Sequence, residues 1–141
     1  MLFLGEFHVS FSGKGRLVVP KKIRQALGKE TTFTLTKGYD ASLAGYRRDD
    51  WRRGTSELTS GAVMGRSRMD FRRQLFSSAV KLEIDDQGRV VIPQSLLEYA
   101  RLANKKKAVI IGVGTHFEIW DLSRWESYSM IIKKKLEEEE S

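Results

Sequence analysis

Five cationic side chains near the N-terminus are the residues best suited to chemistry in this sequence. No carboxylate lies among them between positions 12 and 24; they are Lys14, Arg16, Lys21, Lys22 and Arg24. Clustered cations neutralise the phosphates of a nucleic acid, and an arginine also reads the edge of a guanine through paired hydrogen bonds. The segment therefore predicts a phosphate-binding surface.

A further arginine, Arg89, occupies the matching place in a related segment 73 residues later. In that segment Asp85 and Arg89 stand at the two ends of a turn and are positioned to form an ion pair. Ser12 replaces the aspartate in the first segment, so Arg16 is expected to lack this local partner. For Arg16, DNA contact is therefore favoured over a side chain folded back onto turn carbonyls or a neighbouring carboxylate. For Arg89, DNA contact and an internal ion pair are equally well supported.

Catalytic or metal chemistry has little support in the sequence. The histidines are His8 and His116; each lies in or beside an expected strand, without a cysteine or carboxylate at metal-ligand spacing. The sequence contains no cysteine, which excludes a thiol nucleophile and a disulfide framework. Two glycines, Gly112 and Gly114, fit a turn better than a nucleotide-binding loop. We expect no enzymatic activity, no cofactor and no bound metal.

The cationic loop belongs to an internal duplication. The pattern Gly-Arg-x-x-x-Pro begins at Gly15 and returns at Gly88, with a spacing of 73. Alternating apolar residues before each loop and a valine-rich run after it predict two strands, and the proline then favours the start of a helix. Two more strands complete each β-β-α-β-β unit. Since one unit has too few strands to close a core, we expect the two units to interleave into a small swapped-hairpin barrel.

The expected fold class is therefore mainly β with short helices (α+β), with helices after each unit. We divide the chain into a first unit at 5–51, a helical connector at 52–78, a second unit at 79–125, and a C-terminal helix with a charged tail at 126–141. Gly54, Gly61 and Gly65 are expected to interrupt the connector. In the later part of the second unit the spacing becomes 74, matching Gly38 to Gly112, and Ser-Arg-Trp-Glu at 123–126 predicts a capping box.

The charge of the chain favours a polyanionic partner. The formal net charge is +7 and the pI is about 9.8. Residues 1–74 carry 15 Lys and Arg against 7 Asp and Glu, whereas residues 75–141 carry 10 against 11. The cationic character is thus concentrated in the first half. No apolar run approaches the roughly 18 residues of a membrane span, and the N-terminus lacks the basic region of a signal peptide. We expect a cytoplasmic protein.

Three motifs together resemble the MraZ family of bacterial transcriptional regulators. They are the repeated Gly-Arg-x-x-x-Pro hairpins, Phe-Arg-Arg-Gln-Leu-Phe at 71–76, and Glu-Ile-Trp-Asp at 118–121. The resemblance runs from about residue 1 to residue 130 and implies two AbrB-like swapped-hairpin domains. The family signature is an Asp-x-x-x-Arg pair in each half. Asp85 and Arg89 match it, whereas the first half has Ser12 at the aspartate position.

The resemblance implies a nucleoid-associated repressor of the operon for cell division and cell-wall synthesis. Members of the family bind spaced direct repeats in double-stranded DNA, including their own promoter, as ring-shaped homo-oligomers. By motif position, Lys14 and Arg16 take the principal DNA-contacting role, with Arg24 nearby, and Arg89 takes the corresponding place in the second half. No modulating ligand, operator sequence or ring size follows from these residues.

Two other classes of function remain open at the level of the sequence. A single-strand RNA or nucleoid-binding protein would use the same basic face, but it needs aromatic stacking platforms, and residues 12–24 contain none. A structural ring that binds no nucleic acid would instead direct its basic loops at an acidic protein. Competition between duplex and single-stranded ligands separates the first alternative from a duplex-binding regulator.

Overall fold

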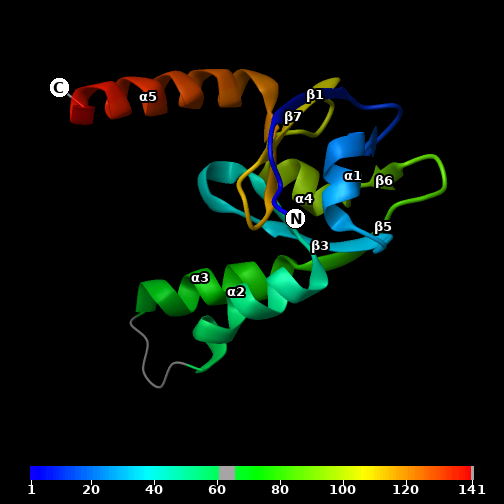
Figure 1. Ribbon diagram of the computed structural model, residues 1–141, viewed down its shortest axis with the longest axis horizontal. Coiled ribbons are helices and arrows are strands. Elements are labelled where there is room, and N and C mark those ends of the chain that lie inside the picture. The colour runs from blue at the N-terminus through cyan, green and yellow to red at the C-terminus, as the bar shows by residue number, and fades with distance from the viewer. Residues whose placement is uncertain (61–65, 141) are drawn as a thin grey trace.

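The computed structural model describes residues 1–60 and 66–140 and shows the duplicated units with their helices (Figure 1). The first unit contains β1 (Glu6–Ser10), β2 (Arg16–Val18), α1 (Lys21–Leu27), β3 (Thr32–Lys37), the 3-10 turn η1 (Tyr39–Ala41) and β4 (Leu43–Tyr46). The connecting helices are α2 (Arg48–Ser60) and α3 (Arg66–Ser78). The second unit contains β5 (Val80–Glu83), β6 (Arg89–Val91), α4 (Gln94–Tyr99), β7 (Lys107–Gly112) and β8 (Phe117–Asp121), followed by α5 (Leu122–Glu140). This mixed content confirms the α+β class.

The strands of the two units interleave, as the need to close a core predicts. Six antiparallel strands form one sheet in the order β1-β7-β8-β4-β3-β5, and β2 pairs with β6 in a separate ribbon. Only β3–β4 and β7–β8 join strands of the same unit; β1–β7, β4–β8, β3–β5 and β2–β6 each join strands of different units. Neither unit therefore has a sheet of its own.

The register reveals an approximate two-fold symmetry between the units. Leu17 lies opposite Val90 in the β2–β6 ribbon, so each residue faces its own duplicate. Ala44 and Glu118 face each other in the same way, at the expected spacing of 74. The third strands depart from this spacing, because β3 and β7 begin 75 residues apart. Gly112 ends β7 whereas Gly38 follows β3, so the expected match of these two glycines is wrong by one residue.

The two loops connect the sheet to the ribbon around a shared core. The main-chain N–H of Ser12 donates to the carbonyl of Arg16 at 2.8 Å, and that of Asp85 donates to the carbonyl of Arg89 at 2.9 Å. The loops thus link the edge strands β1 and β5 to β2 and β6. Side chains from both units fill the interior, including the buried residues Phe3, Leu17, Ile23, Leu35, Val90, Ile110 and Phe117.

The helices differ from the sequence expectations in detail. Pro20 and Pro93 stand at the cap positions just before α1 and α4. The helix α2 begins at Arg48, with Asp49 and Asp50 in its first turn. It continues through Gly54, which was expected to interrupt it, whereas Gly61 and Gly65 lie outside the described residues. A glycine in an exposed helix costs only about 1 kcal/mol, which favourable packing elsewhere outweighs.

The start of α5 corrects the expected capping box at 123–126. Ser123 lies inside the helix, which begins at Leu122. Asp121 is the capping residue, because its Oδ2 accepts a hydrogen bond from the main-chain N–H of Arg124 at 3.1 Å. The first turns of α5 pack Trp125 and Tyr128 against Trp120 of β8. The C-terminal end of α5 projects away from the body (Figure 1). None of the described helices is both long and apolar enough to span a membrane.

Candidate nucleic-acid interface

The first loop (residues 12–16) carries its cations on a backbone that is hydrogen-bonded to the other unit. Gly15 adopts φ +77°, a left-handed conformation that favours glycine. Its carbonyl accepts a hydrogen bond from the main-chain N–H of Ile92, 2.8 Å away across the ribbon. Lys14 and Arg16 on either side of it are exposed. The main chain at the end of β6 thus fixes the loop, while the side chains of Lys14 and Arg16 remain accessible.

Arg16 is partly folded back onto its own turn, the arrangement that the sequence favoured less than DNA contact for this residue. Its Nε donates to the main-chain carbonyl of Ser12 at 3.1 Å and to the Ser12 hydroxyl at 3.3 Å. Ser12 therefore takes over the aspartate's bond to the arginine Nε without its charge. No carboxylate of the described chain forms an ion pair with Arg16. The terminal nitrogens, Nη1 and Nη2, form no hydrogen bond with any described residue, so they are available to a ligand.

The second loop (residues 85–89) neutralises its own arginine. Asp85 Oδ2 accepts a hydrogen bond from Arg89 Nε at 2.9 Å, and its Oδ1 accepts from the main-chain N–H groups of Gln87 and Arg89. The Arg89 main-chain bond contributes most, and together with the other hydrogen bonds it lowers the pKa of Asp85 below its usual range. The predicted ion pair is therefore present. Arg89 is nevertheless 35% exposed, which leaves part of the guanidinium open to a ligand.

The interleaving separates the five cations that are contiguous in the sequence. The Arg24 side chain lies against Gly88 of the second loop, where an added Cβ would approach its Cζ to 3.0 Å. Arg24 Nε also donates to the carbonyl of Val19 at 2.9 Å, so the side chain is part-buried and braces the backbone. Leu97 occupies the duplicate position beside Gly15 of the first loop. The helix α1 thus lies beside the second loop, and α4 lies beside the first.

Lys21 and Lys22 are exposed on the first turn of α1. Neither forms an ion pair with a described residue, so both remain available to phosphates. The candidate residues therefore form two groups: Lys14 and Arg16 on the first loop, and Lys21, Lys22, Arg24 and Arg89 at the second loop with its neighbouring helix. Of these, Arg24 is held by the scaffold, because its part-buried side chain lies against Gly88 and its Nε is bonded to the carbonyl of Val19.

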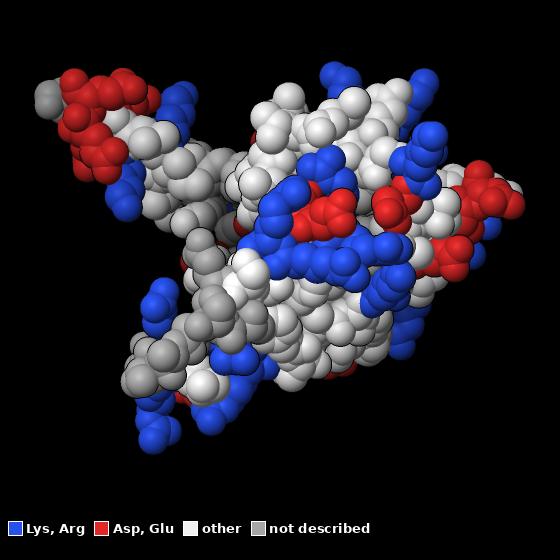
Figure 2. Space-filling view, turned by 60° about the horizontal axis from the view of Figure 1, so that its bottom comes forward, with Lys and Arg blue, Asp and Glu red and all other residues white. Residues whose placement is uncertain are grey.

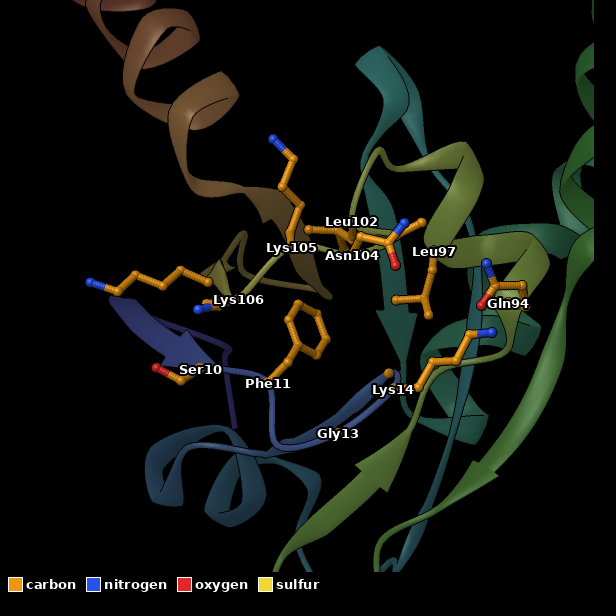
Figure 3. Close-up of a pocket in the computed structure, with 13 residues that line it drawn as sticks. Ser10, Phe11, Gly13, Lys14, Gln94, Leu97, Leu102, Asn104, Lys105 and Lys106 are labelled. Carbon is orange, nitrogen blue, oxygen red and sulfur yellow. The ribbon is translucent and has the colours of Figure 1, made fainter.

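The structure adds a lysine run that the sequence reasoning missed. Lys107 pairs with Ser10 in the β1–β7 ladder, and the carbonyl of Lys106 accepts the main-chain N–H of Phe11 at 2.9 Å. These contacts place residues 105–107 beside the first loop, where they and Lys14 line one cleft (Figure 3). Three consecutive lysines in the neutral half were the available signal, but only the strand pairing shows which loop they flank.

Several cations elsewhere are accompanied by carboxylates. Figure 2 views the molecule from the side of α2 and α3, where a belt of Lys and Arg crosses the body with Asp and Glu among them. Arg47, just before α2, and Arg53 on α2 both pair with Asp50, and Nη2 of Arg48 lies 4.0 Å from Oε2 of Glu30. Burial raises the pKa of Asp50, but the hydrogen bonds from the two arginines outweigh it and lower the value. These arginines have carboxylate partners, whereas the first-loop cations have none among the described residues.

Comparison with known proteins gives consistent matches over nearly the whole chain. The family model described as "MraZ protein, putative antitoxin-like" matches twice, at residues 2–72 and 75–141. A "Transcriptional regulator MraZ" of Acetivibrio thermocellus is 43% identical over 128 residues, covering 91% of this chain and 87% of the relative. The proteins of the same name from Moorella thermoacetica and Ligilactobacillus salivarius are 41% and 39% identical, covering 90% and 91% of this chain and 86% and 87% of the relatives. The two matches of the family model agree with the duplication seen in the strands.

Proposed function

Because the chain belongs to the MraZ family, we propose that it is a transcriptional regulator that binds double-stranded DNA through its hairpin loops. The observation that carries this proposal is the first loop, where Lys14 and Arg16 are exposed and no described carboxylate pairs with them. Arg16 is the side chain expected to read a base edge, since its terminal nitrogens can form the paired hydrogen bonds that guanine accepts. Lys14 is expected to contact phosphate.

The second loop and α1 form the other half of the proposed interface. Lys21 and Lys22 supply phosphate contacts, and Arg89 contributes through the exposed part of its guanidinium. Arg24 acts mainly by holding the loop, through its bond to Val19 and its position against Gly88. We thus assign sequence reading to the first loop and backbone positioning to the second.

The finer features of the proposal follow from the resemblance of the motifs. The protein would act on the nucleoid in the cytoplasm as a repressor of the cell-division and cell-wall operon, its own promoter included. A ring-shaped homo-oligomer would place successive first loops on spaced direct repeats. In such a ring each additional contact is intramolecular, so weak binding per protomer becomes strong binding overall.

Duplex binding by the intact protein over a salt series tests the proposal. We expect a promoter fragment with spaced repeats to bind much more tightly than a scrambled fragment of equal composition, with affinity falling as salt rises. Equal affinity for the two fragments would refute sequence-specific regulation. Stronger competition by single-stranded RNA than by duplex would support the RNA-binding alternative instead. The oligomer mass and the DNA footprint together test the ring, since protomer and repeat spacings must agree.

A further inference from the structure

The cleft beside the first loop has the composition of an anion-binding groove. It measures about 710 Å³, and its walls come from the first loop, from α4 and from the turn that precedes β7. We call it the lysine groove, after Lys14, Lys105, Lys106 and Lys107 in its lining. Figure 3 shows the Phe11 ring between the loop and the Lys105–Lys106 turn, with the Lys14 side chain extending toward Gln94. Both units of the chain therefore build it.

The charge of the lysine groove is unbalanced. Its lining contains four lysines and no carboxylate. Lys105 is partly compensated, since its Nζ lies 3.7 Å from Oδ1 of the buried Asp121. Lys14, Lys106 and Lys107 are exposed and have no ion-pair partner in the described parts of the chain. Repulsion among these lysines destabilises the folded state, and a bound anion would relieve it. The cluster is therefore better explained by ligand binding than by folding.

The first unit has no lysine at the positions equivalent to the lysine run of the second unit. At the spacing of the third strands, residues 105–107 correspond to Glu30, Thr31 and Thr32, which lie at the start of β3. There the carbonyl of Thr31 accepts the main-chain N–H of Ile84 at 2.7 Å, just as Lys106 accepts that of Phe11. The same backbone thus forms without a single lysine at these positions. The lysine run is therefore not required for folding.

We propose that the lysine groove binds the phosphodiester backbone of the same duplex that Arg16 contacts, through Lys14, Lys106 and Lys107. This inference rests on the proposed DNA-binding function and extends it to residues of the second unit. Gly13, Lys14 and Gly15 form both the loop and one wall of the groove, so a strand held by the loop continues along that wall. The partly buried Phe11 offers an apolar surface to a sugar group between phosphates.

A charge-neutralising variant tests the assignment. In Lys106→Gln/Lys107→Gln we expect equal loss of affinity for a one-repeat duplex and for its scrambled counterpart, because phosphate contacts carry no sequence information. The slope of log Kobs against log salt should shrink by about 0.9 for each lost phosphate contact. The matched control is Lys133→Gln/Lys134→Gln on α5, which removes the same charge away from the groove and should leave the slope near that of the wild type.

Labelling of the unaltered protein gives a second measurement that does not depend on a folded variant. Bound duplex should protect Lys106 and Lys107 from acylation, whereas Lys133 and Lys134 should remain reactive. An unchanged salt slope in the groove variant together with unprotected lysines would overturn the groove assignment. A changed preference between the two duplexes would also overturn it, since the lysines would then read bases.

Two further outcomes distinguish this inference from its premise. If the unaltered protein binds no duplex, the proposed function fails, whatever the groove does. If it binds duplex normally but Lys106 and Lys107 are protected only by a free mononucleotide or pyrophosphate, the groove is a site for a small anion and the backbone assignment fails. A mononucleotide that gives no protection while the duplex protects would support the backbone assignment.

Discussion

In the first loop, Arg16 is anchored by the neutral Ser12 and keeps its terminal nitrogens available, whereas in the second loop Arg89 is held by the charge of Asp85. Each loop is also flanked by the other unit. The lysine run of the second unit lies beside the first loop, and α1 of the first unit lies beside the second. The duplication therefore provides two similar backbones, and the charges around them have diverged.

The comparison explains how one exposed cationic site can exist on a symmetric scaffold. A hydrogen-bonded carboxylate stabilises a loop and neutralises the arginine that it holds. A serine retains part of the geometry and leaves the positive charge in place. The first loop thus exchanges an internal ion pair for a charge that a phosphate or a base can use.

The largest effect is expected on stability, when an alanine replaces the glycine of each loop. The pair of variants compares the backbones of the two loops directly. Both Gly15 and Gly88 have φ near +80°, so an alanine in either costs about 1–2 kcal/mol. In Gly15→Ala the new Cβ would also lie 2.7 Å from the carbonyl oxygen of Ile92, a main-chain atom that cannot easily move. In Gly88→Ala the nearest atoms belong to the flexible Arg24 side chain.

We therefore expect Gly15→Ala to lower the free energy of unfolding by about 2–4 kcal/mol and Gly88→Ala by about 1–2 kcal/mol. Urea unfolding of the two variants beside the wild type measures this difference. Equal losses of unfolding free energy would show that the surroundings of Gly15 are no more restrictive than those of Gly88, and the two loop backbones would then not differ.

The loop arginines give the next largest effect, on DNA binding instead of stability. Arg16→Ala should cost roughly 1–3 kcal/mol on the repeat-containing duplex and relax the sequence preference. Arg89→Ala should cost less, because part of that guanidinium already serves Asp85. Anisotropy titrations of both variants on repeat and scrambled duplexes test this order. A greater loss of specificity in Arg89→Ala would reverse the assignment of the two loops.

The local elements of the fold were accessible from the sequence because their causes are local. Alternating apolar residues predicted β1 and β5, and the prolines after the valine-rich runs predicted the starts of α1 and α4. The interleaving followed from the small number of strands in one unit. The Asp85–Arg89 ion pair was predicted for the same reason, since both partners stand in one turn.

Contacts between the units could not be obtained in this way. Arg24 is eight positions from Arg16 in the sequence, yet the β2–β6 pairing and the position of α1 place it against Gly88. The lysine run reaches the first loop only through the β1–β7 register. The capping of α5 was missed because Asp121 also ends β8, and a strand residue is not an obvious helix cap.

A smaller effect is expected when the carboxylate is restored to the first loop. In Ser12→Asp the new side chain should hold Arg16 as Asp85 holds Arg89. We expect DNA affinity to fall by about 0.5–1 kcal/mol at low salt, and the loss to shrink as salt rises. Titrations at two salt concentrations measure it, with Asp85→Ser as the reciprocal variant. Unchanged affinity at both concentrations would show that the anchor of Arg16 does not control its availability.

The smallest expected effect is the response of the second loop to acid. Because hydrogen bonds to Asp85 lower its pKa in the folded protein, the carboxylate stabilises this loop above its unfolded pKa of about 3.9, and that contribution is lost as the pH falls through the lower folded value. The first loop has Ser12 at this position and should not respond in the same way. Backbone amide shifts of Arg89 should therefore titrate with a midpoint below about 3.9, whereas those of Arg16 should stay constant. In Asp85→Asn the Arg89 transition should disappear, and its persistence would assign the acid response to another carboxylate.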